Sequence, residues 1–228
     1  MKRICDLFFA FLLLCSSAQA QREAPENLGF VRFINLVEAG EGKTDLNIDG
    51  AKIWKKGYSF GQRTGGLAYK RGNHEFSVSK AGCLTAKQKV KVEAKQSLTL
   101  VGYAEESFDE DGQFLGWQIK LANLKQHSPE KGFSVTFVSF CKEKFLDLEI
   151  EEVLSRKKLK QAVAQRRVAR LNFANKSRMK TIVSYKGEIL GAINVDEPGN
   201  YVAMIYDGED GKRKLKYFYD AKFTSSKN

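Results

Sequence analysis

The feature that most constrains the fold of this chain is a strand-like pattern that occurs twice, about a hundred residues apart. Residues 30–36 (FVRFINL) open the first copy, and residues 133–140 (FSVTFVSF) open the second. Further blocks follow in the same order and at similar spacings: residues 44–48 and 145–150, residues 90–93 and 193–196, and residues 98–103 and 201–206. Because self-similarity at a fixed spacing indicates one structural unit used twice, we predict a tandem duplication.

Within each copy, apolar and polar residues alternate with a period of two. Val31 and Phe33 should point to one side of a strand and Arg32 to the other, as in a sheet with one buried face. Turn signals such as Asp-Gly and Pro-Gly-Asn separate the runs, and short strands divided by such turns are typical of a sandwich. The predicted core of the first unit is Val31, Phe33, Leu46, Ile48, Val90 and Val92, matched in the second by Val135, Phe137, Leu148, Ile150, Ile193 and Val195.

These patterns predict an all-β chain of two tandem, structurally similar, small antiparallel β-sandwich domains after a cleaved signal peptide. The signal peptide occupies residues 1–20, domain 1 residues 27–125, a polar linker residues 126–132, and domain 2 residues 133–223. About 208 residues remain after cleavage, which is enough for two domains of common size.

The first twenty residues have the pattern of an export signal. Lys2 and Arg3 precede an apolar run at residues 7–14, and Ala18 and Ala20 are the small residues that a signal peptidase reads. The run is shorter than the roughly 20 residues that span a bilayer. Cleavage before Cys15 as a lipoprotein is the alternative, but Leu14 is not a small residue. We therefore expect a periplasmic or secreted protein that does not span the membrane.

One stretch does not follow the strand pattern. Residues 151–169 are rich in Glu, Leu, Lys, Arg, Gln and Ala, with acids first and bases later, as a helix dipole favours. We expect a short helix or loop here, followed by a strand from about Val168. The repeat would instead place a strand over residues 163–171.

Two cysteines remain after cleavage of the signal, Cys83 in the first unit and Cys141 in the second. In an oxidising compartment an even count makes an interdomain disulfide possible. The alternative is two separate, partly buried thiols, because the sequence does not give the distance between their Cα atoms.

The chain carries a formal net charge of +11. Such an excess favours anionic partners, which outside the cytoplasm means acidic polysaccharide, lipid headgroups or an acidic protein face rather than nucleic acid. A solvated basic surface without a ligand is the alternative. The possible anion or partner patch comprises Arg156, Lys157, Lys158, Lys160, Arg166, Arg167, Arg170, Lys176, Arg178 and Lys180.

No catalytic or metal-binding constellation is recognisable, so we expect a non-enzymatic protein without a cofactor. His74 and His127 are the two histidines, and neither has the spacing of a metal site or a nucleophile motif. Residues 40–44 (GEGKT) resemble the end of a phosphate-binding loop, but the motif requires Gly where Val37 stands and a helix afterwards.

Two further groups have both a functional and a structural interpretation. Residues 109–111 (DED) are acidic and lie in a predicted hairpin tip, where a solvated loop is favoured over a calcium site. Trp54 and Trp117 could form a platform that stacks on sugar rings. Because Trp117 lies in an alternating run, packing in a core is the favoured interpretation for that side chain.

The first unit resembles a known class of exported domains. Its opening strand ending in Asn35, the following residues 45–50 (DLNIDG) and the strand at residues 76–78 (FSV) are similar to β-sandwich domains of the DUF4397 type. Two such units behind a signal peptide resemble the periplasmic alginate O-acetylation adaptor family, AlgF. The second unit departs from the pattern, with Thr136 and Ser139 in place of Arg32 and Asn35.

The resemblance implies an exported non-enzymatic adaptor in polysaccharide biosynthesis, which helps to O-acetylate alginate or a similar exported polymer by contacting the acetylation proteins. It assigns no site residues. The alternative hypothesis is a polyanion- or cell-surface-carbohydrate-binding module that uses the basic second domain.

Overall fold

The computed structural model describes residues 27–129, 131–173, 178–208 and 210–220. These residues form β-strands joined by turns and loops, and they contain no helix; the fold is all-β. The predicted signal peptide, Lys176 and residues 221–223 lie outside the described residues. Within the described part of the chain, no helix is long and apolar enough to cross a membrane.

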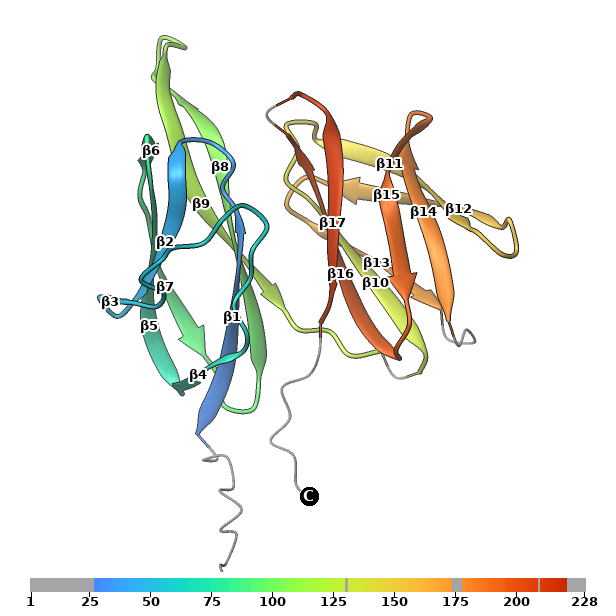
Figure 1. Cartoon of the computed structure of the whole chain (residues 1–228), viewed down its shortest axis with the longest axis horizontal. Coiled ribbons are helices and arrows are strands. Elements are labelled where there is room, and N and C mark those ends of the chain that lie inside the picture. Colours follow the sequence, from blue (N-terminus) through green and yellow to red (C-terminus); the bar gives the residue numbers. More distant parts are fainter. Residues whose placement is uncertain (1–26, 130, 174–177, 209, 221–228) are drawn as a thin grey trace, which may run out of the picture.

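The first domain consists of two sheets packed face to face (Figure 1). The strand order in the first sheet is β4 (Leu67–Lys70), β1 (Leu28–Leu36), β8 (Ser97–Phe108), β9 (Phe114–Lys125) and β6 (Cys83–Leu84). The order in the second is β3 (Ala51–Lys52), β2 (Glu41–Ile48), β5 (Gly72–Ala81) and β7 (Ala86–Val92).

The second domain repeats this arrangement. Its first sheet has the order β13 (Val168–Phe173), β10 (Phe133–Ser139), β16 (Gly199–Asp207) and β17 (Arg213–Tyr219). Its second sheet has the order β12 (Lys158–Ala164), β11 (Phe145–Glu152), β14 (Met179–Tyr185) and β15 (Glu188–Val195). Apart from the short strand β6, each strand of the first domain therefore has a counterpart in the second.

The cores agree with the repeat pattern residue by residue. Each domain has its own cluster of buried apolar side chains between its two sheets. Phe33 and Phe137 are both almost fully buried, and their partners on the neighbouring strands are Leu100 and Ala203. All twelve core residues predicted from the sequence are buried: Val31, Phe33, Leu46, Ile48, Val90, Val92, Val135, Phe137, Leu148, Ile150, Ile193 and Val195.

Most strand pairs are antiparallel, as expected, but the centre of each sandwich contains a parallel pair. Strand β1 runs parallel to β8, and β10 runs parallel to β16. Parallel partners need a long crossover connection, here the whole opposite sheet. The local turn signals therefore gave no indication of this pairing.

The stretch at residues 151–169 differs from the expectation. Lys158–Ala164 form strand β12, which pairs with β11, so the expected helix or loop is wrong over these residues. Leu159 and Val163 contact the core of the second domain, and Lys158 and Lys160 are exposed. Pairing with β11 and burial of this alternating face outweigh the local helix propensity. The strand predicted from about Val168 is confirmed as β13.

A candidate binding cleft between the two domains

The two domains meet through the outer faces of the sheets that contain β1 and β10 (Figure 1). Alternate residues of these strands point away from their own cores, and Ile34 and Leu36 of β1 join Val138 of β10 in a third apolar cluster. This second burial explains why nearly every residue of β1 and all of β10 are buried. The remaining buried members are Val101, Tyr103, Leu124, Val202, Met204 and Phe218.

A buried ion pair also joins the domains. The guanidinium Nη1 of Arg32 lies 2.8 Å from Oδ1 of Asp220, and both side chains are 5% exposed. The Arg32 guanidinium also lies over the ring of Phe218 at 5.2 Å. Burial raises the pKa of Asp220, while the charge and hydrogen bond of Arg32 act in the opposite direction. A pair enclosed in this way favours one relative position of the two sheets, because a shift of the sheets that kept them in contact would leave buried charges without a partner.

Beside this interface lies an open cleft of about 520 Å³. Its wall in the first domain comes from the loop after β1 and from the outer part of the β8–β9 hairpin, including Glu38, Glu106 and Trp117. Its wall in the second domain comes from the loop after β10 and from the β16–β17 hairpin, including Lys142 and Arg213. The cleft is therefore built from corresponding elements of the two repeats.

Aromatic side chains at matching positions line this cleft. Tyr103 lies in β8 and Tyr206 in β16, the strands that pair with the first strand of their domains, and the strand register makes them repeat equivalents. Tyr103 packs on Phe140 across the interface with ring centroids 4.7 Å apart. Tyr206 packs in turn on Phe60 of the first domain at 5.2 Å. Burial raises the pKa of both tyrosines, so their hydroxyls stay protonated and able to donate hydrogen bonds.

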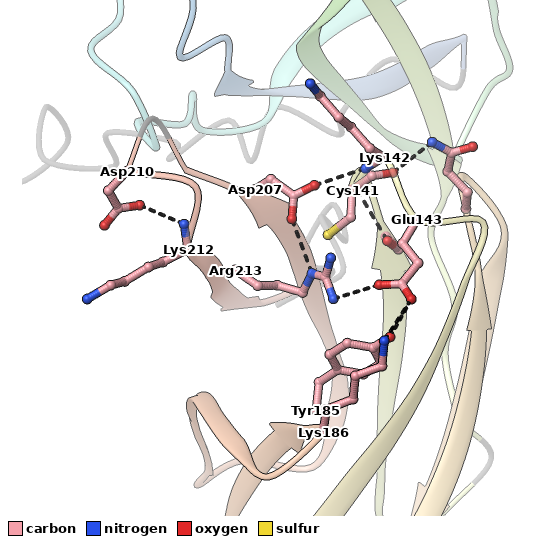
Figure 2. Close-up of polar contacts among 11 residues, drawn as sticks. Cys141, Lys142, Glu143, Tyr185, Lys186, Asp207, Asp210, Lys212 and Arg213 are labelled. Atoms are coloured by element: carbon pink, nitrogen blue, oxygen red, sulfur yellow. Dashed lines mark hydrogen bonds and ion pairs between the residues drawn. The ribbon is translucent and has the colours of Figure 1, made fainter.

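The wall formed by the second domain is held by a chain of polar contacts (Figure 2). Asp207 accepts hydrogen bonds from the backbone N–H of Lys142 at 2.9 Å and from Nε of Arg213 at 3.1 Å. Nη1 of Arg213 donates a hydrogen bond to the carboxylate of Glu143 at 3.0 Å. The same carboxylate accepts a hydrogen bond from the hydroxyl of Tyr185 at 2.5 Å. The pKa of Glu143 is lowered, first by this bond from Tyr185. The charges of this wall are thus fixed in place before any ligand arrives.

Two ion pairs join the domains beside the apolar interface. Nζ of Lys142 lies 2.7 Å from Oε1 of Glu106, and Arg166 forms an ion pair with Glu105. The arrangement offers flat rings, hydroxyls and oriented charges in a concave site, which is the chemistry of a binding site for a small polar ligand. Its volume lies within the range of roughly 300–1,000 Å³ that is usual for such sites.

The two tryptophans do not form a common platform. Trp117 lines the cleft and is half-buried, so it is not a member of the core as the alternation favoured. Trp54 is 38% exposed and packs on Tyr58, away from the lining of the cleft. The sequence indicated one aromatic of this site and missed Tyr103, Phe140 and Tyr206. The signal that could have found the two tyrosines is their matched position at the ends of residues 98–103 and 201–206.

The two cysteines are free thiols, so the possible interdomain disulfide is not formed in this structure. Cys83 packs against the core of the first domain, and its Sγ donates to the carbonyl of Ala39. Cys141 is fully buried in the core of the second domain, and burial raises the pKa of its thiol to about 11. Each thiol belongs to a separate core, which is the alternative that the sequence left open.

The described members of the predicted basic patch are all exposed, but they divide between two sheets. Arg156 and Lys158 form ion pairs with Glu151 of the neighbouring strand β11. Arg166 is turned toward Glu105 of the first domain, where it contributes to the interface. The sheet that contains β12 and β14 carries Lys158, Lys160 and Lys180. The turn before β12 carries Arg156 and Lys157, and Arg178 precedes β14. Strand β13 and the turn before it, in the other sheet, carry Arg166, Arg167 and Arg170.

The remaining candidates have local structural roles. His74 lies in β5, where Nδ1 is 2.6 Å from Oδ2 of Asp49 and Nε2 is 2.8 Å from the carbonyl of Lys70. His127 lies in the segment between the domains, and burial lowers its pKa.

Residues 41–44 of the GEGKT segment begin strand β2 rather than a helix. Oδ1 of Asp109 accepts from two backbone N–H groups of the β8–β9 turn. Among the residues that the structure describes, no group of acidic, His and Cys side chains could hold a metal ion.

Comparisons with known proteins do not assign this chain to a family. No protein-family profile matches it, and no curated protein matches it. Among solved structures, the Bacillus anthracis TIE protein is similar with a TM-score of 0.26 and 10% sequence identity, over 83% of this chain and 51% of that protein. The chain thus spans about half the length of that protein. A likeness at this TM-score does not establish a shared fold or function.

Proposed function

We propose that the protein is an exported, non-enzymatic adaptor in polysaccharide biosynthesis, and that it takes part in O-acetylation of alginate or a similar exported polymer. It works in the periplasm alongside the polysaccharide-modifying proteins, by binding rather than by catalysis. The observation that carries this proposal is the cleft between two sandwiches that are locked together by an apolar interface and the Arg32–Asp220 pair. A preformed concave site between two rigid domains suits a protein that holds a ligand for others.

The experiment that tests this function is deletion of the gene in its own host. The acetyl content of the exported polysaccharide, measured per sugar unit, should fall, and the wild-type gene should restore it. A matched variant, Trp117→Ala in the cleft, should restore less, whereas Trp54→Ala outside the cleft should restore fully. Unchanged acetylation in the deletion strain would exclude this role. Hydrolysis of acetyl esters by the purified protein would contradict the non-enzymatic part of the proposal.

A second candidate is a polyanion-binding module on the second domain. The observation that favours it is the exposure of Lys157, Lys160 and Lys180 on one sheet and its adjoining turn. Acidic residues of β11 are interspersed, since Glu149 pairs with Lys160 in register and Glu151 forms ion pairs. Such a surface should bind a uronate polymer at low salt and release it as salt screens the contacts. If Lys160→Glu together with Lys180→Glu leaves that binding unchanged, the basic sheet has no part in it.

A further inference from the structure

We infer that the interdomain cleft binds a neutral pyranose sugar, with Trp117 stacking on the ring and carboxylates accepting its hydroxyls. This inference rests on the proposed function for its biological setting and narrows it. Alginate is a chain of uronates, so a cleft that prefers neutral sugars favours a similar exported polymer with neutral units as the one that is acetylated. The chemistry itself comes from the cleft alone.

The charge of the lining excludes a strongly anionic sugar as the preferred ligand. Three carboxylates face the cleft, from Glu38, Glu106 and Asp207, against two cations, from Lys142 and Arg213. Both cations already have carboxylate partners, at 2.7 Å for Lys142 and 3.0 to 3.1 Å for Arg213. A uronate would therefore have to break an existing ion pair or face excess negative charge, and like charges in one site repel.

The two cations of the lining act against a cationic ligand. The fixed guanidinium of Arg213 and the ammonium of Lys142 stand on the wall of the second domain. A ligand amine placed between the domains would lie close to both of them. A neutral ligand with many hydroxyls meets neither penalty, because each hydroxyl can donate to a carboxylate and accept from a cation that stays paired.

Geometry supports a flat, partly apolar ligand. Trp117 is half-buried in the lining, and Phe114 packs against it edge to face with centroids 6.1 Å apart. Tyr103 and Phe140 add a packed pair of rings to the lining at the interface. Sugar rings combine apolar C–H faces with polar edges, so a site lined by both aromatic rings and carboxylates fits both.

Glu38 is the carboxylate best placed to recognise hydroxyls. It is half-buried in the loop after β1, and its repeat equivalent on the opposite wall is Lys142. Among the residues that the structure describes, its carboxylate forms no ion pair. Its negative charge adds to the raised pKa of Lys214, which comes first from the hydrogen bond with Asp210, and to that of Tyr206, which comes first from burial. A ligand hydroxyl can therefore donate to Glu38 without breaking an ion pair.

The test uses the full-length mature protein with Trp54→Phe, which leaves Trp117 as the only tryptophan. The probes are neutral hexose trisaccharides, a uronate trisaccharide and an amino-sugar trisaccharide, each titrated at the same ionic strength. We expect a saturable change of Trp117 fluorescence with the neutral sugars, and at least about tenfold weaker binding of the uronate. Tighter binding of the uronate or the amino sugar, or no binding of any neutral sugar, would overturn the inference.

Two variants, followed by calorimetry, locate the site. Glu38→Gln should weaken neutral-sugar binding about three- to tenfold, since it replaces a charged acceptor by a neutral one, and should lessen discrimination against the uronate. Tyr69→Phe, outside the cleft, should change neither. Equal affinities in all three proteins would place the binding elsewhere and refute the inference.

The outcome is separable from that of the proposed function. Loss of acetylation in the deletion strain with no sugar binding would keep the adaptor and reject the cleft as a sugar site. Sugar binding with unchanged acetylation would do the reverse.

Discussion

The two domains share one strand order but use their outer faces differently. At equivalent positions of the first strand, Arg32 of the first domain ion-pairs across the interface, whereas Thr136 of the second hydrogen-bonds to Asn200 within its own domain. In the loops that follow these two strands, the equivalent residues Glu38 and Lys142 bring opposite charges to the cleft. The inward-facing residues of the repeats remained alike, since both cores need the same packing. Some outward-facing residues, such as Arg32 and Thr136 or Glu38 and Lys142, diverged and now differ in charge on the two sides of one interface.

The long hairpins show a second difference. Strands β8 and β9 have 12 residues each, whereas β16 and β17 have 9 and 7. The longer hairpin extends beyond its sandwich (Figure 1) and exposes Phe108, Phe114 and Leu115 near its tip. The shorter one ends at the cleft, where Asp207 and Arg213 form its wall. The same supersecondary unit thus lines the cleft in both domains, and in the first domain it also projects an apolar tip.

The largest expected effect tests whether the two cores are equivalent. Phe33→Ala and Phe137→Ala should each lower the free energy of unfolding by about 3–5 kcal/mol, because each removes a fully buried ring. Urea denaturation should be followed by tryptophan fluorescence, which reports the first domain and its contact with the second because Trp117 lines the cleft, and by circular dichroism, which reports both domains. A loss below about 1 kcal/mol in either variant would mean that the two cores are not equivalent in packing.

The next effect tests the interface that distinguishes the domains. Asp220→Ala should cost about 3 kcal/mol, because it leaves the buried guanidinium of Arg32 without its partner carboxylate. The matched control is Asp45→Ala, which breaks the exposed pair with Lys52 and should cost less than about 1 kcal/mol. Similar unfolding midpoints for both variants would show that the interdomain pair does not hold the sheets together.

A smaller effect concerns the projecting hairpin. Phe114→Ala should cost only about 0.5 kcal/mol, the size of one cross-strand aromatic pair, because Phe114 is 55% exposed and touches Phe108 and Trp117 at the tip. The thermal unfolding midpoint measures it against wild type. A cost above about 1.5 kcal/mol would mean that the tip packs as part of the fold.

The smallest effect is a pH dependence confined to the first domain. The hydrogen bond to Asp49 raises the pKa of His74 above 6.5, and the hydrogen bond from His74 lowers the pKa of Asp49 below 3.8. The contribution of His74 to stability is therefore complete below its unfolded pKa and disappears as the pH rises through its higher folded pKa. The contribution of Asp49 is present above its unfolded pKa and disappears as the pH falls through its lower folded pKa.

The measurement is an NMR titration of His74 in wild type and in Asp49→Asn. The folded pKa of His74 should exceed the ordinary value in wild type and fall toward it in the variant. The register of the strands places Thr181 at the equivalent position of the second domain, where its hydroxyl bonds to the carbonyl of Ile193 and does not titrate. An unshifted pKa in wild type would remove this difference between the domains.

The sequence by itself determined the all-β class, the duplication and the twelve core positions. Burial of one strand face requires apolar residues at every second position, and this alternation is visible in the sequence. It also located the strand from Val168. It misjudged Lys158–Ala164, since local helix propensity there is outweighed by pairing with β11, a contact that no local pattern records. It left the basic residues as one possible patch, although Arg166 contributes to the interface.

Only the tertiary structure decided which outer faces meet and where the cleft lies. Alternation shows that Arg32 and Ile34 point away from the core of β1, but not that they meet Asp220 and Val138 of the other domain. The cleft brings together residues that are distant in the sequence: Tyr103, Phe140, Lys142 and Arg213. Tyr103 and Arg213, for example, are more than a hundred residues apart. Docking of two domains depends on the shape and charge of complete surfaces. Those surfaces exist only after each chain segment has folded, so the pattern of a single strand cannot encode them.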